Sequence, residues 1–282
     1  MIQKRPMHNR SFYPGDLKRQ VEDFLSGFEP PDEPVDLVGG VVPHAGWMFS
    51  GRVAAKVWRT LAERRRPRSV ILFGAVHNPS VEVNAIYPEG SWETPLGDVE
   101  VDAELAALIL NAVSALAAAD PDAHRGEHSI EVQMPFIKAL LPGVKVVPIA
   151  VSPHHQPVQL GDLIAHATKG LPVIAVGSSD LTHYGEDRFA FAPRGTGPAA
   201  HEWMKSNDQR VILLAERLLA EEIQPEVAAH HNACGPGALA AVTAFARARG
   251  SEGGIVLEHT TSHEVVPEAS FTAGVGYAGM VF

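Results

Sequence analysis

The chain has 282 residues, of which 45% are hydrophobic and 20% are charged, enough to bury the core of one large α/β domain or two small ones. Its formal net charge of -10 leaves no basic surplus to displace counterions, which argues against non-specific nucleic-acid binding. No run approaches the roughly 18 apolar residues of a membrane span, the first residues lack the apolar stretch of a signal peptide, and one cysteine permits no intrachain disulfide. We therefore expect a cytoplasmic protein with no membrane or nucleic-acid partner.

Predicted strands and helices alternate along the chain. Apolar, β-branched runs that predict buried strands lie at 36–42, 69–76, 144–151, 172–178, 254–259 and 271–282. Helical patterns lie at 15–28, 51–65, 102–117, 128–141, 199–220 and 235–250. This alternation predicts an α/β fold, a three-layer α/β/α sandwich with a central mixed, largely parallel sheet, formed by a single domain over residues 1–282.

Two segments leave their structure open. The final run, FTAGVGYAGMVF, fits either an antiparallel edge strand or a close-packed central strand. Segment 78–102 has hairpin character, and its Pro-Leu-Gly-Asp step is a plausible turn.

Polar side chains follow three of the predicted strands at the point where each strand ends. His44 directly follows LVGGVVP, and His77 directly follows VILFGAV. The stretch PVIAVGSSDLT contains Asp180 and is followed by His183. A single histidine after a strand is more often a loop or core residue than a ligand. Because the carboxyl ends of parallel strands meet at one edge of the sheet, however, three such placements predict a shared site.

Two further stretches supply candidate side chains. In EHSIEVQMPF, Glu127 and His128 precede a predicted helix, where a polar residue can serve as a cap or belong to a site. In HHNACGPGALAAV, Cys234 precedes a helix start, where free N–H groups and the helix dipole stabilise a thiolate. A buried apolar cysteine is the alternative.

Two histidines and one anionic side chain form a facial triad. With open coordination positions, this arrangement suits non-haem Fe(II) and its O₂ chemistry. A thiolate in place of a carboxylate is softer and also accepts Cu or Zn. The residues therefore favour a divalent metal site over any particular metal.

Six stretches in order along the chain resemble the Memo family: RSFYPGD, VVPHAGWMFSG, ETPLGDVEVD, EHSIEVQMPF, GSSDLTHYG and NACG. Bacterial members of that family, of the AmmeMemoRadiSam system protein B type, accompany AMMECR1-like and radical-SAM proteins. The family is similar in fold to the class III (LigB-type) extradiol dioxygenases. The resemblance runs nearly end to end.

The resemblance implies roles for particular residues. It implies His44, His77 and Cys234 as metal ligands, and His183 as the acid/base histidine with Asp180 beside it. It also implies a substrate pocket lined by Glu127 and His128, for which Trp47 and His231 are further candidates, with plain core packing as the alternative for Trp47. Where family members often read GPSHH, this chain reads GAVHN, a departure that bears on the pocket and not on the three ligands.

The implied function is a metal-dependent, dioxygenase-like enzyme. Fe(II) would be the most suitable metal, with Cu or Zn as alternatives, and O₂-dependent redox chemistry on a small substrate would be the activity. The alternative is a non-catalytic adaptor that uses the same scaffold to bind a metal or a peptide. A zinc-dependent hydrolase is a third interpretation.

Overall fold

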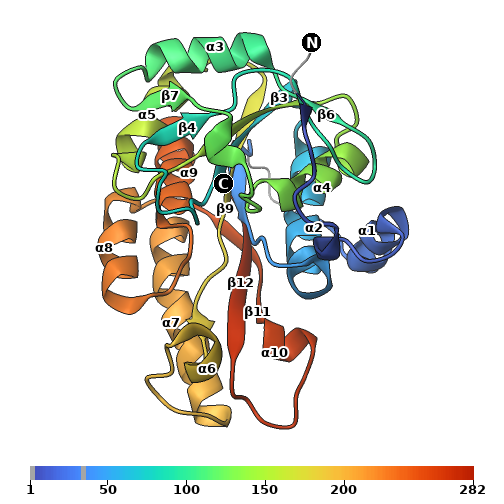
Figure 1. Ribbon diagram of the computed structural model, residues 1–282, viewed down its shortest axis with the longest axis vertical. Helices are drawn as coiled ribbons and strands as arrows, with labels where there is room; N and C mark the ends of the chain where they lie inside the picture. Colours follow the sequence, from blue (N-terminus) through green and yellow to red (C-terminus); the bar gives the residue numbers. More distant parts are fainter. Residues whose placement is uncertain (1–3, 33–35) are drawn as a thin grey trace.

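The structure, a computed structural model, describes residues 4–32 and 36–282. Its main feature is a nine-stranded sheet in the middle of the molecule (Figure 1). In the order in which they pair, the strands are β10 (His183–Tyr184), β12 (Gly274–Val281), β2 (Gly39–Val42), β9 (Val173–Ser178), β3 (Ser69–Gly74), β8 (Lys145–Ala150), β4 (Asn84–Ile86) and β7 (Ala117–Ala119), with β11 (Ile255–Thr261) on the other side of β12.

The centre of this sheet is parallel. β2 pairs with β9, β9 with β3, and β3 with β8, all in parallel register. β12 pairs antiparallel with β2, β10 and β11, so the final run of the chain is an interior antiparallel strand and not an edge strand. Because β2, β3 and β9 run in the same direction, the segments that follow them all leave from one edge of the sheet.

Helices cover both faces of the sheet (Figure 1). Along β3, Ile71 and Phe73 belong to one hydrophobic core and Val70 and Leu72 to the other, as expected of a strand buried on both faces. The first core contains residues of α3 (Ala103–Ala112), α5 (Pro157–Ala167), α7 (Pro198–Glu216), α8 (Ala220–His230) and α9 (Pro236–Ala248). The second contains residues of α1 (Leu17–Leu25), α2 (Trp47–Arg64) and α4 (Met134–Leu140). The predicted three-layer α/β/α sandwich is confirmed.

A smaller sheet lies beside the main one. β5 (Ser91–Trp92) and β6 (Val99–Glu100) form the antiparallel hairpin predicted within residues 78–102, and β1 (Lys4–Arg5) pairs parallel with β5. The short helical elements are Arg10–Phe12, Asp122–His124, Glu131–Gln133, α6 (Glu186–Phe189) and α10 (Ser262–Val265). Within the described ranges, no helix combines the length and hydropathy that a membrane crossing needs.

The helix predictions differ from the structure at three places. α5 was not predicted, and the helix predicted over 199–220 ends at Glu216, where Leu218 takes a positive φ of 57° before α8 begins. The helix predicted from residue 128 is also wrong at its start: a 3₁₀ turn occupies Glu131–Gln133, and α4 begins at Met134. Pro135 in the first turn favours a helix start there, since proline lacks the N–H that a helix interior needs. Glu127 and His128 therefore lie in an irregular segment.

Candidate metal centre

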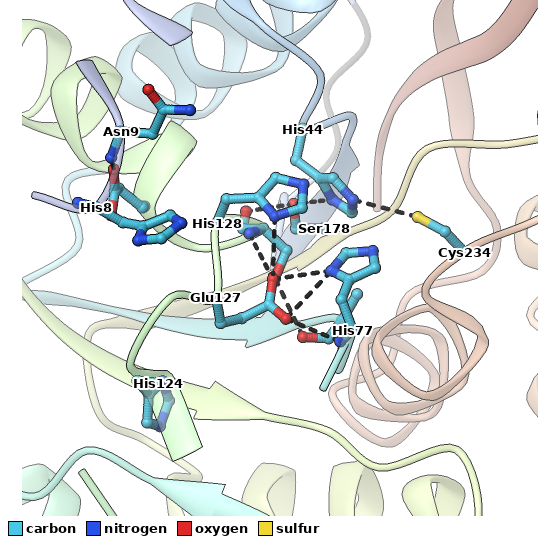
Figure 2. A network of polar contacts seen from close by, with 12 residues as sticks. His8, Asn9, His44, His77, His124, Glu127, His128, Ser178 and Cys234 are labelled. Carbon is cyan, nitrogen blue, oxygen red and sulfur yellow. Dashed lines mark hydrogen bonds and ion pairs between the residues drawn. The ribbon is translucent and has the colours of Figure 1, made fainter. Parts of the chain in front are cut away.

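Four segments bring polar side chains together at the carboxyl edge of the parallel strands. His44 follows β2, His77 follows β3, Ser178 ends β9, and Cys234 immediately precedes the N-cap of α9. Figure 2 shows the two imidazoles and the sulfur facing one another. Strand ends alone predicted that His44, His77 and the pair Asp180 and His183 would share this edge; His44 and His77 meet here, and the third member of the group, Cys234, comes from a helix start.

The three predicted ligands lie within coordination range of a common point. Sγ of Cys234 lies 3.2 Å from Nε2 of His44, and one ligand atom from each of His44, His77 and Cys234 lies within 4.8 Å of the others. Two ligands at a tetrahedral angle, with bonds of about 2.3 Å to sulfur and about 2.1 Å to nitrogen, would stand about 3.6 Å apart. Two nitrogens and a sulfur therefore fit a divalent ion such as iron, zinc or copper.

The orientation of the His44 ring is set by a chain of hydroxyl contacts. The side chain is almost fully buried, and its Nδ1 lies 3.0 Å from Oγ of Ser178. That hydroxyl donates its own proton to the carbonyl of Ser129 at 2.8 Å, so it accepts a proton from Nδ1 of His44. The neutral ring then carries its proton on Nδ1, and the lone pair of Nε2 points toward Cys234.

The orientation of the His77 ring is set by Glu127. Nδ1 of His77 lies 3.0 and 3.1 Å from the two carboxylate oxygens, and the carboxylate also accepts the backbone N–H of His77 at 2.9 Å and that of Ser129 at 2.8 Å (Figure 2). Such a carboxylate–histidine pair directs the other ring nitrogen, Nε2, toward a metal. Glu127 was predicted to line the pocket; its side chain is buried and works as the support of a ligand.

A glycine lets the Glu127 segment approach β3 closely. A Cβ atom on Gly74 would lie 2.4 Å from Cγ1 of Ile130 and 2.9 Å from Oγ of Ser129, closer than such contacts can be. Glycine at the end of β3 therefore allows residues 127–130 to pack against the strand that leads to His77.

Without a metal, two of the three ligands carry a proton near neutral pH. Burial would lower the pKa of His77, but Cys234 and Glu127 outweigh it and raise that pKa to about 10. Burial raises the pKa of the Cys234 thiol, which favours the protonated thiol over the thiolate that the helix start could stabilise. Burial holds the pKa of His44 well below its usual range, which leaves that ring neutral.

Metal affinity should therefore fall as the pH falls. A proton must leave Nε2 of His77 and another must leave Sγ of Cys234 before either atom can coordinate, whereas His44 releases none. Between pH 6 and 8 we expect the association constant for Co(II) to rise by up to about 100-fold per pH unit. Titration calorimetry in buffers of different ionisation enthalpy should count about two protons released per ion. An affinity that does not change over this range would contradict the assignment of both protons.

Two more imidazoles lie beside the ligands. The ring of His128 stacks on that of His77 at 4.7 Å between centroids and on that of Phe12 at 5.2 Å. Burial lowers the pKa of His128, and it lowers the pKa of His183 to about 4, so both rings are neutral at neutral pH. Within the described part of the chain, neither ring nitrogen of His183 hydrogen-bonds to another residue, which leaves the ring free to exchange a proton with a ligand.

Asp180 takes a different place from the one expected of it. Its carboxylate accepts the backbone N–H of His44 at 2.6 Å, and no hydrogen bond joins it to the His183 ring among the residues described. Burial raises the pKa of this carboxyl to about 7, against the effect of the backbone donors of His44 and Ala45. Its own carbonyl accepts the N–H of Cys234 at 3.1 Å. Asp180 therefore links the segments that carry two of the ligands, and the idea that it orients the ring of His183 gains no support.

The remaining predicted pocket residues stand apart from the ligands. Trp47 is fully buried, stacks on Phe136 at 4.0 Å between centroids and donates its indole N–H to the carbonyl of Val132. Trp47 therefore belongs to the hydrophobic core, which was the alternative to a place in the substrate pocket. His231 is exposed at the C-terminal end of α8, with a positive φ of 51° and an edge contact to Phe191.

Sequence patterns did not indicate two residues that support the site. Ser178 selects the tautomer of His44, although the GSSD stretch that contains it was singled out only for Asp180. Arg5 lies against the segment that carries Glu127, and no feature of the N-terminal sequence pointed to it.

The chain was compared with known proteins by family profile, by sequence and by fold. The sequence profile of the Memo family, described as Memo-like protein, matches residues 4–281. The chain is similar to a MEMO1 family protein of Thermococcus kodakarensis, with 36% identity over 287 residues that cover 96% of each chain. It is also similar to a MEMO1 family protein of Methanopyrus kandleri, with 32% identity over 302 residues that cover 100% of this chain and 99% of the relative. In fold it is similar to the crystal structure of an uncharacterized protein, JW3007, from Escherichia coli K12, with a TM-score of 0.54 at 10% identity over 87% of this chain and 99% of that one.

Proposed function

The chain belongs to the Memo-like family, and from this premise we propose that it is a metal-dependent, dioxygenase-like enzyme that uses non-haem iron and O₂ on a small chelating substrate. The observation that carries the proposal is the convergence of His44, His77 and Cys234 within 4.8 Å of one another. Three ligands at one point leave further coordination positions for a substrate and O₂, as in facial-triad iron sites. The proposed substrate has two adjacent oxygen atoms, such as a vicinal diol.

Within this proposal the three ligands hold the ion and the neighbouring imidazoles handle protons. Bound iron would supply Lewis acidity and electron exchange with O₂. His183, which is neutral because burial lowers its pKa to about 4, would take a proton from a substrate hydroxyl at an unoccupied ring nitrogen and return it later. His128, stacked between His77 and Phe12, would form one wall of the substrate site.

Oxygen uptake tests this proposal. The protein is loaded anaerobically with Fe(II), exposed to O₂ and assayed against a panel of catechol-type compounds. We expect O₂ uptake that requires both iron and a panel member. We also expect His183→Gln to lower turnover by about 100-fold or more with unchanged iron content, because a general base contributes at least that much. The control is His201→Gln. His201 is half-buried and hydrogen-bonded to Thr261, so its replacement should leave turnover unchanged.

The same experiment separates the alternatives. No uptake and no spectral change across the panel would overturn the enzyme proposal and favour a non-catalytic adaptor that binds a metal or peptide. Tight zinc retention with O₂-independent hydrolysis would favour a zinc hydrolase. Association with AMMECR1-like and radical-SAM proteins stays a prediction.

A further inference from the structure

The N-terminal arm, residues 4–13, packs against the segment that carries Glu127 and His128. β1 of the arm pairs with β5, and Phe12 stacks on the ring of His128 with an angle of 5° between the ring planes. In Figure 2, His8 and Asn9 of the arm lie on the side of His128 that faces away from Cys234. The arm contains RSF of the RSFYPGD stretch, to which the metal centre itself assigns no role.

Arg5 is the centre of this contact. Its side chain is buried, and its guanidinium lies 4.0 Å from the ring centroid of Trp92. Nε donates to the carbonyl of His124 at 3.0 Å, one terminal nitrogen donates to the carbonyl of Glu127 at 2.7 Å, and the other donates to the carboxylate of Glu131 at 2.6 Å. Three acceptors from one short segment therefore converge on a single planar group, which no other side chain could satisfy at once.

Glu131 accepts hydrogen bonds from the side chain of Arg5 and from the backbone of the arm. Its side chain is 1% exposed, and besides Arg5 its carboxylate accepts the backbone N–H of His8 at 2.9 Å and that of Asn9 at 3.3 Å. The ion pair thus joins the arm to residues 124–131 at several points. A buried ion pair is favourable only when its remaining donors and acceptors are satisfied. Because Arg5 and Glu131 both have these further hydrogen bonds, the pair holds the arm firmly against residues 124–131.

A continuous path runs from Arg5 to the metal ligand His77. The guanidinium holds the backbone carbonyl of Glu127, and the carboxylate of the same residue holds both the backbone N–H and Nδ1 of His77. Freedom in the backbone at Glu127 would therefore turn the His77 ring and misdirect its Nε2. Arg5 itself touches none of the three ligands in the described structure.

We propose that Arg5 is a positioning residue of the metal centre, which sets metal affinity by fixing the backbone that carries Glu127 and, through Glu127, the ring of His77. The inference rests on the proposed metal centre, because it concerns one of its ligands. It does not depend on O₂ chemistry or on the identity of the substrate.

Co(II) binding to the full chain tests the role of Arg5. Arg5→Met keeps the length and apolar packing of the side chain and removes every donor. We expect it to weaken Co(II) affinity by about 10-fold, the lower end of the effect of partners that orient a ligand. The bands of the bound Co(II), including the thiolate charge-transfer band, should shift in position or intensity because the ligand geometry changes. Arg5→Lys keeps the charge for Glu131 but cannot reach all three acceptors, so it should recover much of the thermal stability and little of the affinity.

A second, partly buried ion pair supplies the matched control. Nζ of Lys56 lies 2.8 Å from the carboxylate of Glu258, with side-chain exposures of 11% and 22%, and among the residues described neither side chain makes a hydrogen bond or ion pair to His77 or Glu127. Lys56→Met should lower thermal stability while leaving Co(II) affinity and spectrum unchanged. The inference is overturned if either Arg5 variant binds Co(II) within about twofold of the unaltered chain, or if Lys56→Met weakens binding equally. Failure of the unaltered chain to bind Co(II) would instead overturn the metal centre itself, and with it this inference.

Discussion

Replacing Cys234 with serine is expected to weaken Co(II) and Zn(II) affinity by about 100-fold or more. Outer partners of a ligand alone are worth about 10- to 100-fold, so a lost ligand should cost at least the upper end of that range. A serine hydroxyl stays protonated at neutral pH and is a poor ligand for a borderline metal, whereas the thiol can release its proton to the ion. The measurement is competition against a chelator of known affinity.

The matching variants locate the effect. His44→Ala should weaken binding to a similar extent, because it removes the nitrogen that lies 3.2 Å from the sulfur. His201→Ala removes a half-buried imidazole bonded to Thr261, outside the site, and should leave the affinity unchanged. Full metal occupancy in both Cys234→Ser and His44→Ala would exclude these residues as ligands.

Replacing Trp47 with alanine is expected to lower the free energy of unfolding by about 3–5 kcal/mol, the usual cost of removing a large buried aromatic side chain. The residue is fully buried against Phe136 and donates its indole N–H to the carbonyl of Val132 at 3.2 Å. It also begins α2, three residues after His44, so its packing fixes the start of the helix that follows the ligand. Urea unfolding of the metal-free chain measures the effect.

Trp47→Phe separates packing from hydrogen bonding. The smaller ring keeps most of the contact with Phe136 and leaves the Val132 carbonyl without its donor, so a loss of about 1–3 kcal/mol is expected. Co(II) affinity of this variant should stay within about threefold of the unaltered chain, because the indole touches none of the three ligands. A loss below about 1 kcal/mol for Trp47→Ala would show that the ring is not packed as described, and would return it to the list of pocket residues.

The candidate metal centre has a supporting residue beside each of its two imidazoles. Ser178 holds Nδ1 of His44 and Glu127 holds Nδ1 of His77, so in each ring Nε2 is the nitrogen left for the ion. The two supports differ in charge. Burial lowers the pKa of His44 and leaves its ring neutral, whereas Cys234 and the Glu127 carboxylate raise the pKa of His77 to about 10, so that this ring carries a proton. A metal that bound here would therefore displace protons mainly from His77 and Cys234.

Much of the fold follows from local sequence signals. The continuous apolar runs at β2, β3, β8 and β9 predicted strands buried on both faces, and the helix patterns between β2 and β3 and between β3 and β8 predicted a largely parallel sheet. Short irregular elements were less predictable. α8 contains Pro225, which disfavours a helix interior, whereas α5 was not predicted although its buried residues follow a helical spacing.

The roles of several site residues could not be predicted, because they depend on distant partners. Glu127 looked like a helix cap or pocket residue, yet its carboxylate bonds to His77, 50 positions away in sequence. Arg5 bonds to the carbonyl of His124, 119 positions away. Asp180 was paired with its near neighbour His183, whereas its carboxylate accepts the N–H of His44, 136 positions away. Proximity in sequence is a poor guide to such contacts.

The sequence by itself determined the alternation of strands and helices, the edge of the sheet at which the site lies, and the three side chains that meet there. The alternation and the edge follow from hydrophobic periodicity and from the shared direction of parallel strands, whereas Cys234 was included among the three side chains through the resemblance to the Memo family. Only the tertiary structure decided which ring nitrogen of each histidine is left for an ion, which of the candidate ligands carry a proton, and which residues hold them in place. These depend on the approach of backbone and side-chain groups from remote segments, since burial and a hydrogen-bond partner together set both orientation and pKa.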